Sequence, residues 1–275
     1  TIEAINRNVN FETLAEVVKE IKAGGNIHQH LDLIAGLPYE DYTSFGKSFD
    51  DVYNLQPEQL QLGFLKVLKG SMLHQKQKEF SIVYHDLAPY EVMTTHMLPY
   101  SDTLRLKYIE EMVETYYNSG KFLHTLQYLI AFYESPFRFF EELSAFWLKE
   151  GCQYQSFSRI GLCDVLWNFV QGKEEINLRH FQWAMKFDFA LQERPKKLPD
   201  WLKIGNETGQ SDVVSAKIVE TYLPQYVGVE KKNLNRLTYL EVFGDETPKA
   251  VLFDYGRKDL LNHAEYQIIP LEEVR

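Results

Sequence analysis

The sequence predicts an α/β fold with parallel strands, followed by a mainly α-helical domain that ends in a small β tail. Helix-like and strand-like segments alternate with short connections over residues 1–98, which is typical of βαβ units. Helical periodicity then dominates, and short β-like runs close the chain. We therefore expect an aromatic-rich helical domain over residues 99–205 and an α+β tail over 206–275 that packs on it.

Residues 27–40, IHQHLDLIAGLPYE, organise the α/β part. Residues 27–34 alternate with period two between an aliphatic face and a face that carries polar side chains, as a strand does. The second face comprises His28, His30, Asp32 and Ile34. Such a face is unusual for a buried strand unless it lines a cavity, and in a parallel α/β barrel that cavity is the active site.

The neighbouring elements follow from local signals. Asn10 is the expected N-cap of a helix that a glycine pair ends. After the first strand the chain must turn at Gly36, and helix-like residues 41–54 lead to a second strand over 60–67. We expect the two strands to be parallel neighbours with Asp32 on the concave side. Because a lone βαβ unit cannot cover both sheet faces, we also expect further strands upstream of Thr1.

Glycine and proline mark the ends of the later elements. Ser135 is the expected cap of a helix with Pro136 in its first position. The predicted helices span residues 103–119, 122–134, 135–151, 157–171, 177–193 and 211–223. The strand-like runs cover residues 237–243, 250–255 and 266–269, and we expect a small antiparallel sheet there.

Composition excludes several classes of partner. The net charge of −10 over 275 residues argues against nucleic acid, which requires clustered Lys and Arg. No apolar run approaches the length of a membrane span, and no signal peptide is visible. Cys152 and Cys163 are the only cysteines, which favours a reducing, cytoplasmic location over a disulfide scaffold. The chain starts at Thr1 in helix-like sequence, so we expect a fragment of a longer protein.

Two functional interpretations rest on the residues alone. His28, His30 and Asp32, spaced by two, could serve a metal-dependent barrel hydrolase, although no further Cys or His accompanies them. Alternatively, the α/β part is a scaffold for a helical interaction module, whose aromatic bundle over residues 99–193 would hold a partner or a large planar ligand.

Four short motifs in a fixed order carry a resemblance to a known family. They are AINR (4–7), DLIAGLP (32–38), Pro57 before a strand, and VLKGS (67–71). Together they resemble the C-terminal half of a radical S-adenosylmethionine barrel, closest to the coproporphyrinogen-oxidase-like and cobalamin-binding branches. The latter branch includes anaerobic magnesium-protoporphyrin IX monomethyl ester cyclases. The resemblance covers residues 1–98 and implies part of a partial TIM-type barrel, while the helical remainder resembles a C-terminal domain of unknown function.

The resemblance implies a set of residues that bind S-adenosylmethionine: Arg7, Asp32, Ile34, Gly36, Lys66 and Val67. In it, the planar guanidinium of Arg7 pairs with the methionyl carboxylate of the cofactor. Asp32 accepts hydrogen bonds from the ribose hydroxyls, and Ile34 packs on adenine. Lys66 and Val67 offer backbone groups to the adenine edge. His28 and His30 have no family role, but they would face the barrel interior as substrate-facing candidates.

The resemblance implies an enzyme whose reactive centre is absent from this sequence. The family binds a [4Fe-4S] cluster through C-x-x-x-C-x-x-C, and the 275 residues contain no such motif. Cys152 and Cys163 cannot replace it, so we expect this chain alone to be catalytically inactive. The implied partners are the N-terminal half of the barrel and an unidentified small-molecule substrate, and one branch of the family adds cobalamin. The implied reaction class is oxidoreductase or transferase.

Overall fold

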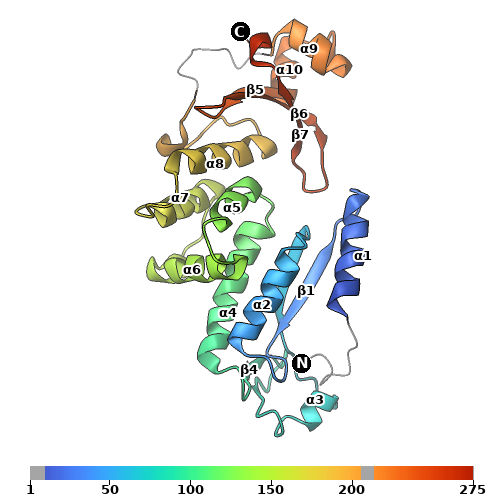
Figure 1. Ribbon diagram of the computed structural model, residues 1–275, viewed down its shortest axis with the longest axis vertical. Helices are drawn as coiled ribbons and strands as arrows, with labels where there is room; N and C mark the ends of the chain where they lie inside the picture. The colour runs from blue at the N-terminus through green and yellow to red at the C-terminus, as the bar shows by residue number, and fades with distance from the viewer. Residues whose placement is uncertain (1–9, 206–213, 275) are drawn as a thin grey trace. The chain divides into compact units, whose positions relative to one another are not determined.

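The computed structural model describes residues 10–205 and 214–274 (Figure 1). The chain forms two compact units. Unit 1 contains the described residues up to Gly120 together with Tyr133–Gln155, and unit 2 contains Lys121–Phe132 and the described residues from Ser156 onwards. The sequence analysis grouped residues 100–120 and 133–155 with the later helices, whereas in the structure they belong to the same unit as the parallel strands.

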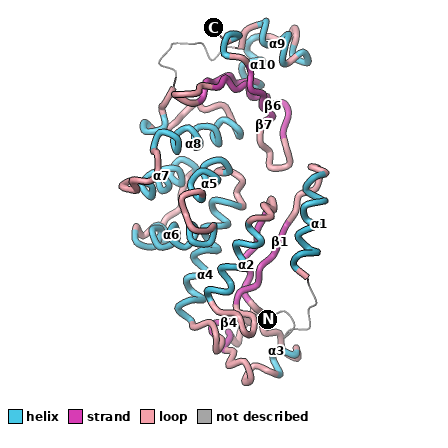
Figure 2. The backbone as a smooth tube through the Cα atoms, in the orientation of Figure 1, coloured by secondary structure: helices cyan, strands magenta, loops and turns pink. Residues whose placement is uncertain are grey.

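Unit 1 combines a parallel strand pair, a short hairpin and several helices. In chain order its elements are α1 (Phe11–Ala23), β1 (His30–Ala35), α2 (Tyr42–Tyr53), β2 (Gln59–Phe64), α3 (Met72–Gln75), β3 (Val83–Tyr84), β4 (Val92–Thr94), α4 (Tyr100–Met112), a π-helical turn (Val113–Tyr117), α6 (Pro136–Lys149) and a 3₁₀ turn (Cys152–Tyr154). Figure 2 shows β1 in magenta beside α2. The β3–β4 hairpin was not expected from the sequence.

The predicted parallel pairing is confirmed. β1 and β2 pair in parallel, with Asp32 opposite Gln61 and Ile34 opposite Gly63. Within the described residues the parallel sheet has these two strands and does not close into a barrel. On its outer side β2 meets a side chain in place of a strand: Asn118 Nδ2 donates to the Leu60 carbonyl and Asn118 Oδ1 accepts from the Leu60 N–H, both at 2.9 Å.

Short polar caps account for the starts of α1, α2 and α6 in unit 1. Asn10 caps α1, and Asp41 caps α2 in a capping box with Ser44. Ser135 caps α6, whose first residue is Pro136, as the sequence predicts. The helix expected over residues 103–119 starts earlier, at Tyr100, and its last turn is π-helical.

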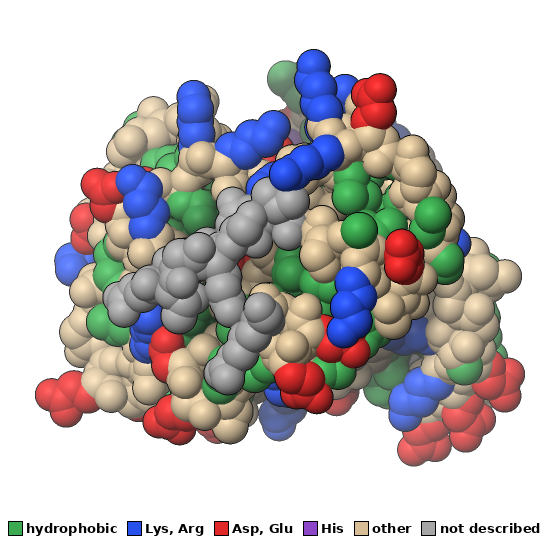
Figure 3. Space-filling model, turned by 90° about the horizontal axis from the view of Figure 1, so that it is seen from above, with side chains coloured by type: hydrophobic (Ala, Val, Ile, Leu, Met, Phe, Trp, Pro, Cys, Tyr) green, Lys and Arg blue, Asp and Glu red, His purple; other side chains and the backbone are tan. Residues whose placement is uncertain are grey.

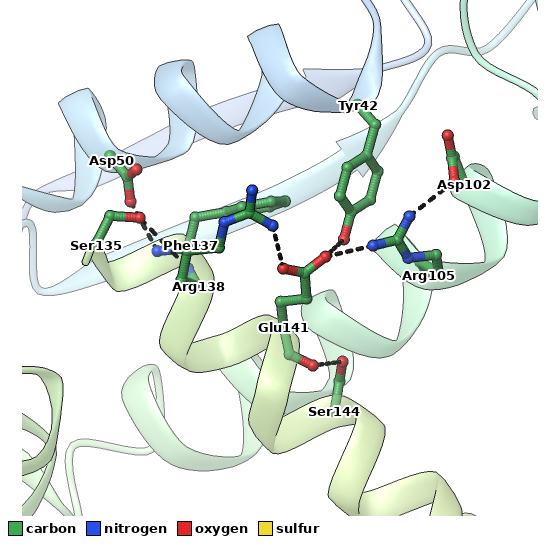
Figure 4. A network of polar contacts seen from close by, with 9 residues as sticks. All are labelled: Tyr42, Asp50, Asp102, Arg105, Ser135, Phe137, Arg138, Glu141 and Ser144. Carbon is green, nitrogen blue, oxygen red and sulfur yellow. Dashed lines mark hydrogen bonds and ion pairs between the residues drawn. The ribbon is translucent and has the colours of Figure 1, made fainter. Parts of the chain in front are cut away.

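A polar network joins α2, α4 and α6 (Figure 4). The carboxylate of Glu141 accepts hydrogen bonds from Tyr42 Oη at 2.7 Å, from Arg138 at 2.5 Å and from Arg105. Burial alone would raise the pKa of Glu141, but the bonds from Tyr42 and Arg138 and the two guanidinium charges lower it. The backbone N–H of Phe137, at the start of α6, donates to Asp50 of α2 at 2.7 Å. These bonds explain why α4 and α6 belong with the strands.

Unit 2 places a helical layer against a small antiparallel sheet. Its elements are α5 (Leu123–Ile130), α7 (Arg159–Val170), α8 (Leu178–Gln192), α9 (Ala216–Tyr222), α10 (Lys231–Leu237), β5 (Thr238–Phe243), β6 (Lys249–Lys258) and β7 (Ala264–Ile269), with 3₁₀ turns at Asp200–Leu202, Pro224–Tyr226 and Leu271–Glu273. The antiparallel order β5–β6–β7 confirms the expected β tail. α10 was not expected.

Buried charges fix two contacts inside unit 2. Asp188 of α8 caps α5 from outside: it accepts from Thr125 N–H at 2.8 Å, from Thr125 Oγ1 at 2.7 Å and from His124 N–H at 3.0 Å. Lys186 of α8 donates to Glu241 of β5 at 2.7 Å, and both side chains are almost wholly buried. α5 is therefore tied to α8, which explains why it leaves the unit of its sequence neighbour α6.

Candidate functional site

The two faces of the β1–β2 sheet differ in burial. Leu60, Leu62 and Phe64 of β2 are buried on one face, together with Ala35 of β1. The opposite face is exposed or half-buried and comprises His30, Asp32, Ile34, Gln59, Gln61 and Gly63. We call this second surface the open face. It is the face that the period-two pattern predicts to line a cavity.

Asp32, Ile34 and Gly63 lie together on the open face. Asp32 is exposed and Ile34, two residues on, is half-buried, so a carboxylate and an aliphatic side chain stand side by side. Gly63 lies opposite Ile34 on the neighbouring strand. A Cβ added at Gly63 would meet only the Leu33 carbonyl oxygen, at an ordinary 3.6 Å. Packing therefore does not require glycine there, and a mid-strand glycine of this kind is typical of a place that a ligand approaches closely.

The two histidines form a pair with each other. His28 Nδ1 and His30 Nε2 are 3.0 Å apart, and the rings meet edge to face at 4.7 Å between centroids. A hydrogen bond between two imidazoles requires one neutral nitrogen as acceptor. Within the described residues no group of three or more His, Cys, Asp or Glu side chains could hold a metal ion, so His28, His30 and Asp32 do not form such a cluster.

The turn after β1 depends on Gly36. Its φ of +85° lies in the region that favours glycine, and a Cβ on it would lie 2.5 Å from Val92 Cγ1. The polypeptide at the end of β1 is therefore packed directly on β4. A side chain at this position would push the turn away from Val92 and displace the end of the open face.

Lys66 and Val67 follow β2 and lie at the same end of the sheet. Lys66 is bridged antiparallel to Glu91, but the hydrogen bonds of this bridge are made by its neighbours: Val67 N–H donates to Tyr90 O at 2.9 Å, and Val92 N–H donates to Leu65 O at 2.8 Å. The peptide groups of Lys66 take no part in the bridge. The Val67 side chain is fully buried and its N–H is already used. Of the two, Lys66 has the backbone groups that a ligand could reach.

Glu40 was missed by the sequence analysis. It follows the Gly36 turn and is buried, and its Oε2 has no hydrogen-bond partner within the described structure. Burial raises the pKa of Glu40 to about 7, although a long hydrogen bond from Ser48 opposes the shift. A lone Glu after a turn carries no sequence signal of burial, so only the packing of the turn against α2 identifies it.

The remaining candidates are placed as follows. Arg7 lies outside the described residues. Cys152 and Cys163 are free thiols, buried in different units. Burial raises the pKa of Cys152, and it raises the pKa of Cys163 to about 12. Neither thiol therefore has the thiolate character that an iron–sulfur ligand needs.

Comparison with known protein families gives one match. No curated protein matches the chain. Over the described residues, no helix is both long enough and apolar enough to cross a membrane. The family described as "Protein of unknown function (DUF4080)" matches residues 78–259, which is more than half of the chain. The match runs from the segment before β3 through β6, and so takes in parts of both units. The chain therefore belongs to the DUF4080 family of proteins of unknown function.

Proposed function

We propose that this chain is part of a radical S-adenosylmethionine enzyme and that the open face of the β1–β2 sheet binds S-adenosylmethionine. One observation carries the proposal: Ile34 and the sterically unnecessary Gly63 lie opposite each other near the C-terminal ends of two parallel strands, with Asp32 two residues earlier on the same face. Ligands bind at this end of the strands in barrels and open α/β sheets. The ordered sequence motifs supply the identity of the ligand.

The open face and the segment that follows β2 offer groups that suit both the ribose and the base of the nucleoside. The exposed carboxylate of Asp32 accepts from the vicinal ribose hydroxyls, and bonds to a charged acceptor are the stronger kind. Adenine lies on Ile34, in the space that the missing side chain of Gly63 leaves open. The backbone groups of Lys66, which its bridge to Glu91 leaves unused, face the edge of the base.

The iron–sulfur cluster does not fit the residues of this chain. The sequence has no C-x-x-x-C-x-x-C motif. Its two cysteines are buried, and burial raises the pKa of both thiols. In the proposed enzyme, polypeptide beyond these 275 residues holds the cluster and supplies the further barrel strands. The residues of this chain would hold S-adenosylmethionine, and a reduced cluster held elsewhere would supply the one electron that cleaves it to methionine and a 5′-deoxyadenosyl radical. His28 and His30 lie at the start of β1, at the opposite end of the open face from Ile34 and Gly63, so the proposal gives them no contact with the reacting part of S-adenosylmethionine.

The helical interaction module is the weaker proposal. It assigns ligand binding to the aromatic run near residue 135, but Phe139 and Phe140 there have no exposed surface, as is also true of Phe181 in unit 2. Rings that are completely buried form core and present no surface to a partner. The open face, in contrast, offers accessible polar groups.

A titration of the chain with S-adenosylhomocysteine, the stable analogue, tests the proposal. We expect saturable binding by saturation-transfer NMR, with S-adenosylmethionine as competitor. Asp32→Asn should weaken binding several-fold, because it removes the charge of the acceptor, which strengthens a hydrogen bond by roughly 1 kcal/mol. Gly63→Ala should weaken it about tenfold while leaving the fold intact or slightly more stable.

Asp51→Asn is the matched control, since Asp51 is an exposed carboxylate on α2. It should bind like the wild type. No saturable binding, or equal losses in the Asp32 and Asp51 variants, would overturn the proposal. A drop in melting temperature for Asp32→Asn with unchanged binding would show that Asp32 only stabilises the turn.

A further inference from the structure

A cavity in unit 2 differs in chemical character from the open face. It has a volume of about 720 Å³ and lies among the start of α7, the end of α8 with the segment that follows it, the end of α10 and the end of β6. All of its lining residues belong to unit 2. This volume falls within the range of sites that hold a small organic molecule, roughly 300–1,000 Å³.

The lining is strongly basic. Its cationic side chains are Arg159, Arg194, Lys196, Lys197, Arg236 and Lys258. Among the described residues of the lining, Glu193 is the one carboxylate. The whole chain carries a net charge of −10, so this concentration of positive charge is local and against the general trend. Figure 3, which looks down on the molecule, shows Lys and Arg side chains along the upper edge of that view and at separate places across it. A concave basic surface of this kind raises the local concentration of anions.

Arg159 gives the cavity a fixed anion-binding group. Its side chain is only 16% exposed, and its guanidinium lies 3.8 Å from the centre of the Phe189 ring. One terminal nitrogen donates to the Asp188 carbonyl at 3.0 Å, while Nε is buried and has no hydrogen-bond partner within the described structure. A buried donor without a partner costs free energy that a bound anion recovers. The only ion pair of Arg159 within the described structure, to the exposed Glu193, is long at 3.6 Å.

The start of α7 adds backbone donors at the same place. Ser158 caps the helix by accepting from Gly161 N–H. The N–H groups of Arg159 and Ile160 have no intrahelical acceptor, because they lie in the first turn of the helix. Ser158, Arg159 and Ile160 all line the cavity. The positive end of the helix dipole therefore coincides with the semi-buried guanidinium, a combination that suits a phosphate group.

Apolar groups complete the lining. Ile160 and Pro195 contribute carbon surface, and the ring of Tyr255 is held by a 2.8 Å hydrogen bond from its hydroxyl to the Ala190 carbonyl. A free inorganic anion would leave this surface unused. We propose that the cavity binds a small organic phosphate, with its phosphate at Arg159 and the start of α7 and its organic part against Ile160 and Tyr255. This assignment is independent of the open face, which belongs to the other unit.

Calorimetric titration of the 275-residue chain with pyrophosphate and with ADP tests the assignment. We expect saturable binding of both probes, tighter for ADP because of its organic part, and weaker binding as salt increases. Lys196→Gln/Lys197→Gln should weaken pyrophosphate binding about fivefold. Both lysines are exposed and have no ion pair within the described structure, so their replacement leaves the fold unchanged. Arg159→Gln should weaken binding by tenfold or more.

Lys217→Gln/Lys249→Gln is the matched control, because it removes two exposed positive charges of unit 2 outside the cavity. It should change affinity less than twofold. Equal losses in the two double variants would reduce the binding to a general charge effect and overturn the assignment. Absence of saturable binding at millimolar pyrophosphate would also overturn it. Tighter binding of a single-stranded oligonucleotide than of ADP would replace the small-molecule ligand by nucleic acid.

Discussion

Gly36 and Val92, far apart in the sequence, are packed so closely that a Cβ on residue 36 would lie 2.5 Å from Val92 Cγ1. This contact sets the end of β1 against β4 and thereby positions the open face. Residue 36 must be glycine for two reasons, because its φ of +85° also favours glycine.

Gly36→Ala should therefore destabilise unit 1 by about 3 kcal/mol, from the positive φ and from overpacking against Val92. Hydrogen exchange of the β1 amides measures this loss. Gly70→Ala is the matched control, because Gly70 has the same φ of +85° but nothing within 4 Å of the added Cβ. It should cost only about 1–2 kcal/mol. Equal losses of stability in the two variants would show that Val92 moves aside for the added methyl group without destabilising the protein.

Glu40 should make unit 1 less stable as pH rises. Its folded pKa of about 7 lies above the ordinary value of 4.5, so the folded state keeps a proton that the unfolded state releases. Its contribution is most favourable below pH 4.5 and is lost as pH rises through about 7, by at most about 3 kcal/mol. Glu40→Gln should remove this dependence and be more stable than the wild type at pH 8.

Hydrogen exchange of α2 amides at pH 5 and pH 8 measures the effect of Glu40. Glu79→Gln serves as control, since Glu79 is an exposed carboxylate of the same unit and should leave the pH dependence unchanged. A Glu40→Gln protein that loses stability between pH 5 and pH 8 as steeply as the wild type would contradict the assignment.

Asn118 should be required for the outer side of β2. Its side-chain amide makes both hydrogen bonds that a neighbouring strand would make to Leu60. Asn118→Leu leaves the N–H and the carbonyl of the buried Leu60 without these partners, so it should lower the free energy of unfolding by about 2–4 kcal/mol. Asn118→Asp retains the acceptor but places a second carboxylate beside Glu114, so it should be destabilising as well. Protection of the Leu60 amide against exchange reports the change, and full protection in the Leu variant would contradict it.

The 275-residue chain should not form an iron–sulfur cluster. Cys152 and Cys163 are buried in separate units, and the pKa of Cys163 is raised to about 12. Anaerobic reconstitution with iron and sulfide, followed by absorbance in the thiolate-to-iron charge-transfer band, measures this directly. We expect no stoichiometric cluster, and a brown holoprotein would show that the thiols rearrange. Cys163→Ala should behave like the wild type.

Much of the fold follows from local sequence. Asn10, Asp41, Ser135 and Asn177 cap the helices that they precede, because a short polar side chain satisfies the free N–H groups of a first turn wherever it stands. The alternation over residues 27–34 and a helix of ordinary length before the next strand predict a parallel pair, and that pair is present. Whether further strands complete a barrel stays a prediction.

Tertiary structure decided the rest. The division into units depends on Asp188 capping α5 and on Glu141 joining α2, α4 and α6, and these bonds link residues that no local pattern relates. The burial of Glu40 and the basic cavity around Arg159 arise in the same way. Periodicity and capping are set by neighbours within about four residues, so the sequence alone determined most of the helices and strands, although not the β3–β4 hairpin or α10. Burial, pKa shifts and cavities depend on which distant surfaces meet, and only the packed structure determined those.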